Sequence, residues 1–360
     1  MLSRAARSLY RLGFLIERTE NIARILDVNS RMSVEQEAFS ELDVWSPILE
    51  ITHNREGFEE HFGEVSAAGV VRLLLADTEN PYSVRACIIE AREIARTARE
   101  MLSEELWLHI NLFYLQTEHE LSGGDLHRWK DFSEKVHLFC NAFHGLMQNT
   151  MVRGDAWQFM RMGVALERAQ MTQRILQIKY HLLLPSSSDV GSALDMHQWQ
   201  ALLRSVSGYE AYRRLYKAKI EPAKVVKLLL LNPGFPRSVH FGIREVSLAL
   251  REIGMCNEDQ FQLYRDTEQF LDDLRGGAAG EEIISMGLFN YLQSVDSRCH
   301  LLGMQIHKAF FDTITVSLED DRERCFTIQI NQQQQANGAV GIRDTSNDQF
   351  TTSGRQELSA

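Results

Sequence analysis

The sequence predicts an all-α protein, and three features of the 360-residue chain support this fold class. Apolar residues recur at helical spacing over long stretches, and no stretch alternates apolar and polar residues for long enough to predict a sheet. Only six prolines interrupt the chain. One helical segment also occurs twice, which favours a pseudo-twofold helical bundle that arose by internal duplication.

The repeated segment is Arg11 to Leu26, RLGFLIERTENIARIL, which returns 150 residues later as Arg161 to Leu176, RMGVALERAQMTQRIL. Seven of the sixteen positions are identical. Each copy places a glycine, two polar residues and an arginine on one helical stripe: Gly13, Glu17, Glu20 and Arg24, and then Gly163, Glu167, Gln170 and Arg174. Because apolar residues run beside this stripe, we expect the stripe to border the core.

The two glycines and the two glutamates each allow a structural and a functional interpretation. A mid-helix glycine costs about 1 kcal/mol relative to alanine, so Gly13 and Gly163 predict a close approach, with helix packing favoured over a ligand. Glu17 and Glu167 either meet arginines across the helix pair as ion pairs that fix its register, or line a polar cleft that holds a cation, an amine or a metal.

Composition and charge exclude several classes of protein. The 44% apolar and 24% charged content is typical of a globular protein that buries one large core. The formal net charge of −11 argues against nucleic acid as the principal partner, because phosphate binding uses surplus lysine and arginine. No long apolar run predicts a membrane span. We therefore expect a cytoplasmic protein with no nucleic-acid or membrane partner.

The five cysteines are odd in number, far apart and without a CxxC pair: Cys87, Cys140, Cys256, Cys299 and Cys325. This pattern predicts reduced, buried thiols and neither a disulfide framework nor a zinc site. The phosphate-binding motifs GxGxxG and GxxxxGK[ST] are absent, so we expect no nucleotide or other cofactor. No Ser-His-Asp or Cys-His pattern predicts a nucleophile.

In the first half, a helix is expected from Ser3 to about Val28, followed by less regular helical regions through His53 and from Phe58 to Leu75. In the segment ENPYSVR, Asn80 is a candidate cap and Pro81 a candidate first residue of a long helical stretch to Leu121. That stretch carries Arg85, Arg92, Arg96 and Arg99 on one face. Four arginines on one face require anions, supplied by Glu17 and Glu167, by a bound carboxylate or phosphate, or by Glu93 and Glu100 nearby.

After a break at residues 122–124, the pattern predicts a helix from Asp125 to near Met151, then the second copy and a loop at 184–188. The segment PRSVH at Pro236 to His240 repeats PYSVR at an offset of 155. Helices are expected on short segments of Trp199 to Arg214 and over about 259–274 and 281–313. The expected domain is 1–316, with halves 1–152 and 153–316, and 317–360 is expected to be a disordered low-complexity tail.

These segments resemble the alpha-E domain family, a bacterial all-helical family named for its glutamate-arginine motif. The motif stands here as Glu17-Arg18 and Glu167-Arg168. The resemblance also rests on ENPYSVR with AREIAR, on LLRSVSGYEAYRR and on LLLNPGFPRSVHF, and it covers about residues 1–315. Gln170, where the family usually has an acid, makes the two stripes unequal and weakens any symmetric metal site.

The resemblance implies a partnership with a circularly permuted ATP-grasp protein encoded nearby, often together with a transglutaminase-like protein. ATP-grasp enzymes join carboxylates to amines through acyl phosphates, so the first hypothesis is a partner of an amide or peptide ligase that holds acceptor or product in a cleft. The candidate cleft residues are Glu17, Arg18, Glu20, Arg24, Glu79, Asn80, Arg85, Arg92, Arg96, Glu167, Arg168, Arg174, Arg204, Tyr209, Glu210, Arg213 and Arg237.

Two other hypotheses remain open. The chain is an enzyme with a ferritin-like carboxylate metal site if the ExxH motifs at Glu50 to His53 and Glu134 to His137 join Glu17 and Glu167. It is a scaffold without its own ligand if the polar stripes are purely structural.

Overall fold

The computed structural model describes residues 1–35, 40–121, 127–182, 193–217, 219–276 and 280–311, and within these ranges the regular elements are all helical. The predicted all-α fold class is therefore confirmed. Residues Met1–Asp312 form one unit. The predicted loops at 122–124 and 184–188, the thiol at position 325 and the predicted tail at 317–360 lie outside the described residues.

The first part of the chain contains α1 (Ser3–Glu35), α2 (Glu41–Ile51), α3 (Arg55–Phe62), α4 (Ala67–Leu75), α5 (Val84–Thr97), the short 3₁₀ turn η1 (Arg99–Met101), α6 (Glu104–Leu121) and α7 (Trp129–Thr150). The second part contains α8 (Asp155–Leu182), α9 (Ala193–Ser205), α10 (Tyr209–Tyr216), α11 (Pro222–Val226), the π-helical turn η2 (Lys227–Leu231), α12 (Val239–Ile253), α13 (Glu258–Gly276), α14 (Gly280–Ile306) and the π-helical turn η3 (His307–Phe311).

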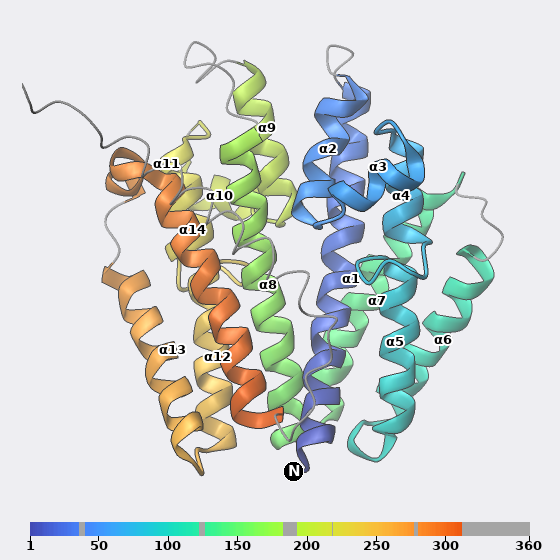
Figure 1. Cartoon of the computed structure of the whole chain (residues 1–360), viewed down its shortest axis with the longest axis vertical. Coiled ribbons are helices and arrows are strands. Elements are labelled where there is room, and N and C mark those ends of the chain that lie inside the picture. Colours follow the sequence, from blue (N-terminus) through green and yellow to red (C-terminus); the bar gives the residue numbers. More distant parts are fainter. Residues whose placement is uncertain (36–39, 122–126, 183–192, 218, 277–279, 312–360) are drawn as a thin grey trace, which may run out of the picture. The chain divides into compact units, whose positions relative to one another are not determined.

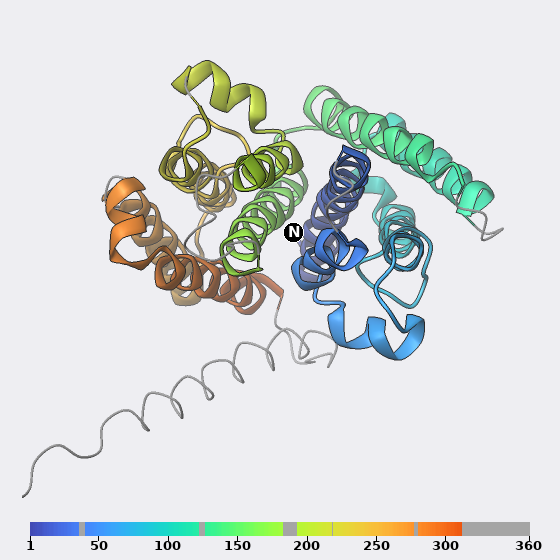
Figure 2. The ribbon, with the colours of Figure 1, turned by 90° about the horizontal axis from the view of Figure 1, so that it is seen from above.

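The helices α1 and α8, which carry the repeated segment, lie side by side at the centre of the unit (Figures 1 and 2). A Cβ atom at Gly13 would lie 2.1 Å from the carbonyl oxygen of Met160. A Cβ atom at Gly163 would lie 2.0 Å from the carbonyl oxygen of Tyr10. Both distances are too short for any side chain, so the predicted close approach is confirmed and is helix packing.

Each central helix is covered by its own set of later helices. The helix α1 packs against α5 and α7, with α6 between these two, whereas α8 packs against α12 and α14, with α13 beside them. Arg11 on α1 donates from Nε to Glu90 on α5 at 2.9 Å, and Arg161 on α8 donates from Nε to Glu245 on α12 at 2.8 Å. The same kind of ion pair therefore fixes α5 on α1 and α12 on α8.

The first helix is longer than the sequence predicted. It continues past Val28 to Glu35 because local bonds replace the missing apolar pattern. Asn29 Nδ2 donates to the carbonyl of Ile25 at 2.8 Å, and Arg31 Nε donates to Asp27 at 3.1 Å. The extra turns matter because α2 and α9 pack against α1.

The predicted start of the arginine-bearing helix was wrong. Asn80 does not cap it: its side chain accepts from the Tyr82 amide at 3.0 Å and donates to the carbonyl of Leu73 at 3.1 Å, which forms a turn. Ser83 is the cap, and its Oγ accepts from the Ala86 amide at 3.0 Å. The side-chain bonds of Asn80 are used up by this turn, so the helix begins at Val84.

The prediction of continuous helix to Leu121 was also wrong, because the chain turns between α5 and α6. The helix α5 ends at Thr97, and Ser103 Oγ accepts from the Leu106 amide at 3.2 Å at the start of α6. The next helix, α7, begins at Trp129 rather than at position 125. Within α14, Gly287 has a φ of 107°, a value that favours glycine and kinks the predicted last helix.

Three of the four described cysteines are buried, as predicted, but Cys256 is exposed after the end of α12. Burial raises the pKa of Cys87 to about 11 and also raises the pKa values of Cys140 and Cys299. In the part of the chain that the structure describes, no helix is both long enough and apolar enough to cross a membrane.

Candidate functional site

The glutamates of the repeated segment form reciprocal ion pairs where α1 and α8 cross. Arg168 donates to Glu17 from Nε at 2.9 Å and from Nη2 at 2.5 Å. Arg18 donates from Nε to Glu167 at 3.2 Å. Both glutamate side chains are 0% exposed, so they cannot form the wall of an open cleft. The structure thus has the ion-paired arrangement, one of the two interpretations that the sequence left open.

Glu17 belongs to a larger charged network that Arg237 completes. Arg237 Nη1 donates to Glu17 at 3.1 Å and to Asn21 Oδ1 at 2.8 Å, and its Nη2 donates to Glu20 at 2.7 Å. Thr172 Oγ1 on α8 donates to the carbonyl of Arg237 at 2.8 Å, which positions this arginine just before α12. One guanidinium group therefore binds three side chains of α1.

The arginines keep both carboxylates of this network ionised. Burial alone would raise the pKa of Glu17, but Arg168 and Arg237 hold that pKa well below its ordinary value. Burial would also raise the pKa of Glu20, and Glu17 adds to this effect, yet Arg237 and Arg24 lower the pKa of Glu20 overall. The network is therefore a set of charges that balance one another inside the protein.

His144 on α7 brings a third possible metal ligand to the two carboxylates. Its Nε2 lies 3.7 Å from Glu17 Oε2 and 3.9 Å from Glu20 Oε2. Three guanidinium groups already contact these carboxylates, those of Arg24, Arg168 and Arg237. A divalent cation would be repelled by these groups, so the cluster does not fit a metal.

The ferritin-like arrangement does not form among the described residues. The one cluster there with three possible metal ligands is Glu17, Glu20 and His144, and neither ExxH motif contributes to it. Glu167, another ligand of that hypothesis, is paired with Arg18 instead. The carboxylate metal site is therefore not supported by the geometry.

Arg24 connects the buried network to an open cavity. One of its terminal nitrogens contacts Glu20, and the other donates to the hydroxyl of Ser207, which lies between α9 and α10. Burial, and after it the charge of Arg237, lowers the pKa of Arg24. The Arg24 side chain is 19% exposed and reaches the cavity wall.

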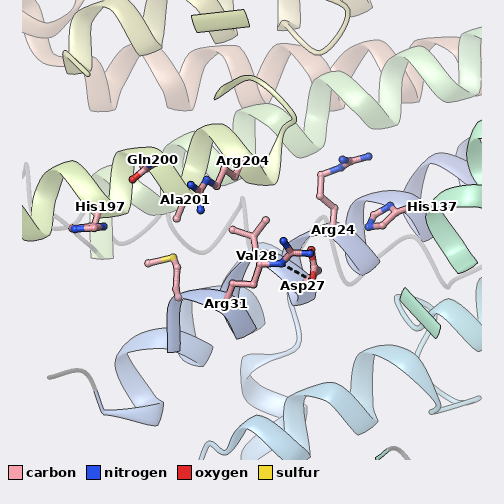
Figure 3. Close-up of a pocket in the computed structure, with 10 residues that line it drawn as sticks. Arg24, Asp27, Val28, Arg31, His137, His197, Gln200, Ala201 and Arg204 are labelled. Atoms are coloured by element: carbon pink, nitrogen blue, oxygen red, sulfur yellow. Dashed lines mark hydrogen bonds and ion pairs between the residues drawn. The ribbon is translucent and has the colours of Figure 1, made fainter. Parts of the chain in front are cut away.

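The cavity has a volume of about 410 Å³ and lies mainly between α1 and α9 (Figure 3). Its lining residues are Arg24, Asp27, Val28, Arg31, Met32, His137, His197, Gln200, Ala201 and Arg204. Figure 3 shows the α1 residues facing those of α9, with His137 of α7 beside Arg24. This volume is within the range of sites that bind small molecules.

Positive charge exceeds negative charge in the cavity. Asp27 is the one acidic residue that lines it, and Asp27 is paired with Arg31 at 3.0 Å. Arg24 and Arg204 add two further guanidinium groups, and Arg204 also stacks over the Tyr209 ring at 5.3 Å. Burial and the nearby charge of Arg24 lower the pKa of His137. Such a surface can bind a carboxylate or a phosphate.

The candidate arginines of α5 lie elsewhere. Arg85 donates to both carboxylate oxygens of Glu118 on α6, at 2.8 and 2.9 Å. Arg92 donates to Asn111 on α6 at 3.3 Å, and Arg96 donates to Glu93 at 2.9 Å. These three arginines therefore join α5 to α6 or pair within α5, and they contact neither Glu17 nor Glu167.

The remaining candidates divide by burial. Asn80 and Arg174 are buried, whereas Glu79, Glu210 and Arg213 are exposed. Tyr209 is half-buried, and Arg213 lies 5.8 Å from the centre of its ring. Of the candidate cleft residues, Arg24 and Arg204 line the cavity.

Several cavity residues were not among the sequence candidates: Asp27, Val28, Arg31, Met32, His197, Gln200 and Ala201. For α1 a signal existed, because Asp27 and Arg31 continue the helical stripe of Arg24 by one and two turns. His137 was considered only as a metal ligand, and no sequence pattern places it near Arg24.

Residues 1–311 match a family model whose description reads "a predicted alpha-helical domain with a conserved ER motif". The match spans the crossing of α1 and α8 and the whole cavity. No curated protein and no solved structure matches the chain.

Proposed function

Because the chain belongs to the Alpha-E family, we propose that it is a helical partner of an ATP-grasp amide or peptide ligase. In this proposal it holds an anionic acceptor or product of the ligase in the cavity beside Arg24. The ligase activates a carboxylate with ATP, and this chain supplies the binding site. The proposal includes a cytoplasmic location, where ATP is available, and a transglutaminase-like protein as a second partner.

The observation that carries the proposal is the excess of guanidinium groups in an open cavity. Asp27 forms an ion pair with Arg31, and the buried Glu20 forms an ion pair with Arg24. Arg204 is exposed, lies over the Tyr209 ring and lines the cavity, so its guanidinium is available to a ligand there. A ligand carboxylate placed between Arg24 and Arg204 receives charge-assisted hydrogen bonds from both sides of the cavity.

The buried glutamates have a different role in this proposal. Glu17 and Glu167 hold the α1–α8 crossing, and Glu17 and Glu20 also fix Arg237 and Arg24. They position the cavity wall and do not touch the ligand. In this proposal the buried residues keep the structural role that the scaffold hypothesis gives them. They belong to the same charged network as Arg24, which lines the cavity.

We also propose that the chain arose by duplication of about 150 residues, giving a pseudo-twofold bundle. Three reciprocal contacts support this origin. Arg18 with Glu167 mirrors Arg168 with Glu17, Arg11 with Glu90 mirrors Arg161 with Glu245, and Gly13 against Met160 mirrors Gly163 against Tyr10. Duplication explains why one crossing carries two copies of the motif and leaves one copy free to become a site.

The test is a coupled assay with the ATP-grasp protein encoded beside this chain. The two proteins are co-purified, and ADP release and the mass of new amide products are measured with and without this chain. We expect the chain to be retained by the ligase and to increase product formation. No retention, together with turnover that does not depend on the chain, would overturn the proposal.

A matched pair of variants locates the site. Arg204→Gln removes one guanidinium from the cavity and should lower product formation about tenfold or more, the effect of losing a charge-assisted bond. Arg214→Gln removes the same charge from an exposed position on α10 that does not line the cavity. Equal effects of the two changes would show that general charge, and not the cavity, is responsible.

A further inference from the structure

We propose that the ligand of the cavity is a carboxylate attached to a short aliphatic group, and that this group occupies a second, apolar cavity next to the first. The second cavity has a volume of about 60 Å³. Its lining residues are Asn29, Met32, Asp43, Val44, Pro47, Ile48, Ile51, Ile175, Ile178, Gln198, Ala201, Leu202 and Ser205. The inference deepens the proposed function and rests on it only for the ligand's role as acceptor or product.

The two cavities share two wall residues, Met32 of α1 and Ala201 of α9. Alanine is small and methionine is flexible, so neither forms a fixed barrier between the cavities. One molecule can therefore contact Arg24 and Arg204 at one end and the apolar residues at the other. The wall that the two cavities share is the observation from which we infer an amphipathic ligand.

The lining of the second cavity is chemically different from that of the first. Four isoleucines from α2 and α8 line it, including Ile48, Ile51 and Ile178, together with Val44, Pro47 and Leu202. Its one acidic residue, Asp43, is engaged in the cap of α2, where it accepts from the Ser40 hydroxyl at 2.7 Å. Asn29 donates to the carbonyl of Ile25 at 2.8 Å. The surface offered to a ligand is therefore apolar and favours a branched aliphatic chain.

The experiment is a calorimetric titration of the full chain, without the ligase, with four probes: acetate, 4-methylpentanoate, 4-methylpentanamide and inorganic phosphate. We expect 4-methylpentanoate to bind about tenfold or more tightly than acetate, because it buries several additional carbon atoms. We expect no measurable binding of the amide, which lacks the charge. Equal affinity for the two carboxylates, or binding of phosphate alone, would overturn the inference.

Two variants separate the ends of the ligand. Ile178→Asn, at a half-buried position, should remove the preference for 4-methylpentanoate while leaving acetate binding unchanged. Arg204→Gln should weaken both carboxylates. Ile94→Asn makes the same change at a half-buried position of α5 outside both cavities, and should keep the preference. Thermal unfolding of each variant identifies any change that acts through loss of folding, and loss of the preference in Ile94→Asn would overturn the assignment.

The titration and the ligase assay fail independently. If the chain supports the ligase but does not discriminate between the carboxylates, the ligand class is wrong and the proposed function stands. If 4-methylpentanoate binds as expected but no ligase is retained, the binding site stands and the partner is wrong.

Discussion

The two ends of the α1–α8 crossing start from the same motif but carry different neighbours. At the Glu17 end, Arg168 donates to Glu17 from two nitrogens, and Arg237 binds Glu17, Glu20 and Asn21. At the second, Arg18 contacts Glu167 through Nε at 3.2 Å. The Arg18 guanidinium also lies over the rings of Tyr82 at 4.0 Å and Phe14 at 4.5 Å.

The two ends differ at a few aligned positions of the repeated segments. Tyr82 stands where the later segment has Arg237, and Gln170 stands where the first copy has Glu20. His144 lies beside Glu20, whereas a Cβ atom at Gly303 of α14 would lie 4.0 Å from Gln170 Nε2. The crossing itself is common to both ends, and only the end with more charge is joined to the open cavity. The contact that both ends share therefore holds the two helices together, and the added charges of the first end hold Arg24 at the cavity wall.

The largest predicted effect compares the two glutamates. Glu17→Gln leaves Arg168 without its buried counter-charge and removes one of the two carboxylates that bind Arg237, so it should lower the free energy of unfolding by about 3–5 kcal/mol. Glu167→Gln loses one contact with an arginine that keeps its aromatic neighbours, so its effect should be smaller. Urea unfolding measures both. The control is Glu90→Gln, in a pair whose side chains are 34% and 44% exposed, with an expected loss under about 1 kcal/mol. Equal losses for Glu17 and Glu167 would contradict the comparison.

The second prediction concerns the part of the crossing that is the same at both ends. Gly13→Ala and Gly163→Ala each force a methyl group against a carbonyl oxygen, so each should lower the free energy of unfolding by about 1–3 kcal/mol. Gly145→Ala is the control, because a Cβ there meets no atom within 4 Å. It should stabilise α7 by up to about 1 kcal/mol. A neutral result at either crossing glycine would show that the contact is looser than its geometry indicates.

Acid should remove the contribution of Glu17 to the free energy of unfolding. Arg168 and Arg237 lower the pKa of Glu17 against the opposing effect of burial, so the native state binds this proton less readily than the unfolded state. The resulting stability is fully present above the unfolded pKa of about 4.3 and is lost as the pH falls through the lower native pKa. The difference in unfolding free energy between wild type and Glu17→Gln should therefore narrow between pH 6 and pH 3. A constant difference over that range would refute this linkage.

The smallest predicted effect is on the binding of anions to the cavity. Burial, and after it Arg24, lowers the pKa of His137, while Glu20 and Asp27 oppose this and Arg237 adds to it. His137 is therefore neutral near pH 7 and gains a proton as the pH falls below its lowered pKa, which adds positive charge beside the ligand. Carboxylate affinity should rise a few-fold on acidification, as measured by titration at several pH values.

The matched variants for this prediction are two histidines of the same cavity. His137→Asn should remove most of the rise in carboxylate affinity. His197→Asn makes the same change at an exposed residue that lines the cavity from α9, and it should remove less of that rise. An undiminished rise in His137→Asn would assign the effect to another group.

The sequence predicted the polar stripe at the α1–α8 crossing, but it did not predict the cavity. Gly13, Glu17, Glu20 and Arg24 repeat at helical spacing, so their common face and its position beside the core follow from local geometry. The partner of Glu17 depends on where the segment before α12 returns to α1, which is a tertiary contact between Arg237 and residues more than 200 positions away. The sequence named Arg237 as a candidate through the repeat, but not what it binds.

Competition between local sequence signals, and contacts between distant segments, explain the other predictions that were wrong or incomplete. Asn80 and Ser83 both suit a helix cap, and the choice was decided by the bond from Asn80 to the Leu73 carbonyl, which the sequence does not reveal. Of the α5 arginines, Arg96 pairs with Glu93 on the same helix, one of the partners that the sequence offered, whereas the acid of Arg85 is on α6, which folds back after the turn at η1. The cavity joins α1, α7 and α9, and no periodicity links these helices.

The glycine contacts restrict how the chain can be altered by evolution or by design. At most tightly packed positions, a larger side chain is tolerated once its neighbour becomes smaller. At Gly13 and Gly163 the obstructing atom belongs to the main chain, and no second-site substitution can shorten a carbonyl group. Gly242 is also restricted by the main chain, because a Cβ there would lie 2.8 Å from the carbonyl oxygen of Ala165 as well as 2.8 Å from the methyl group of Ala169. The two central positions therefore lack a compensating mutation, and libraries built on this fold should leave both codons fixed.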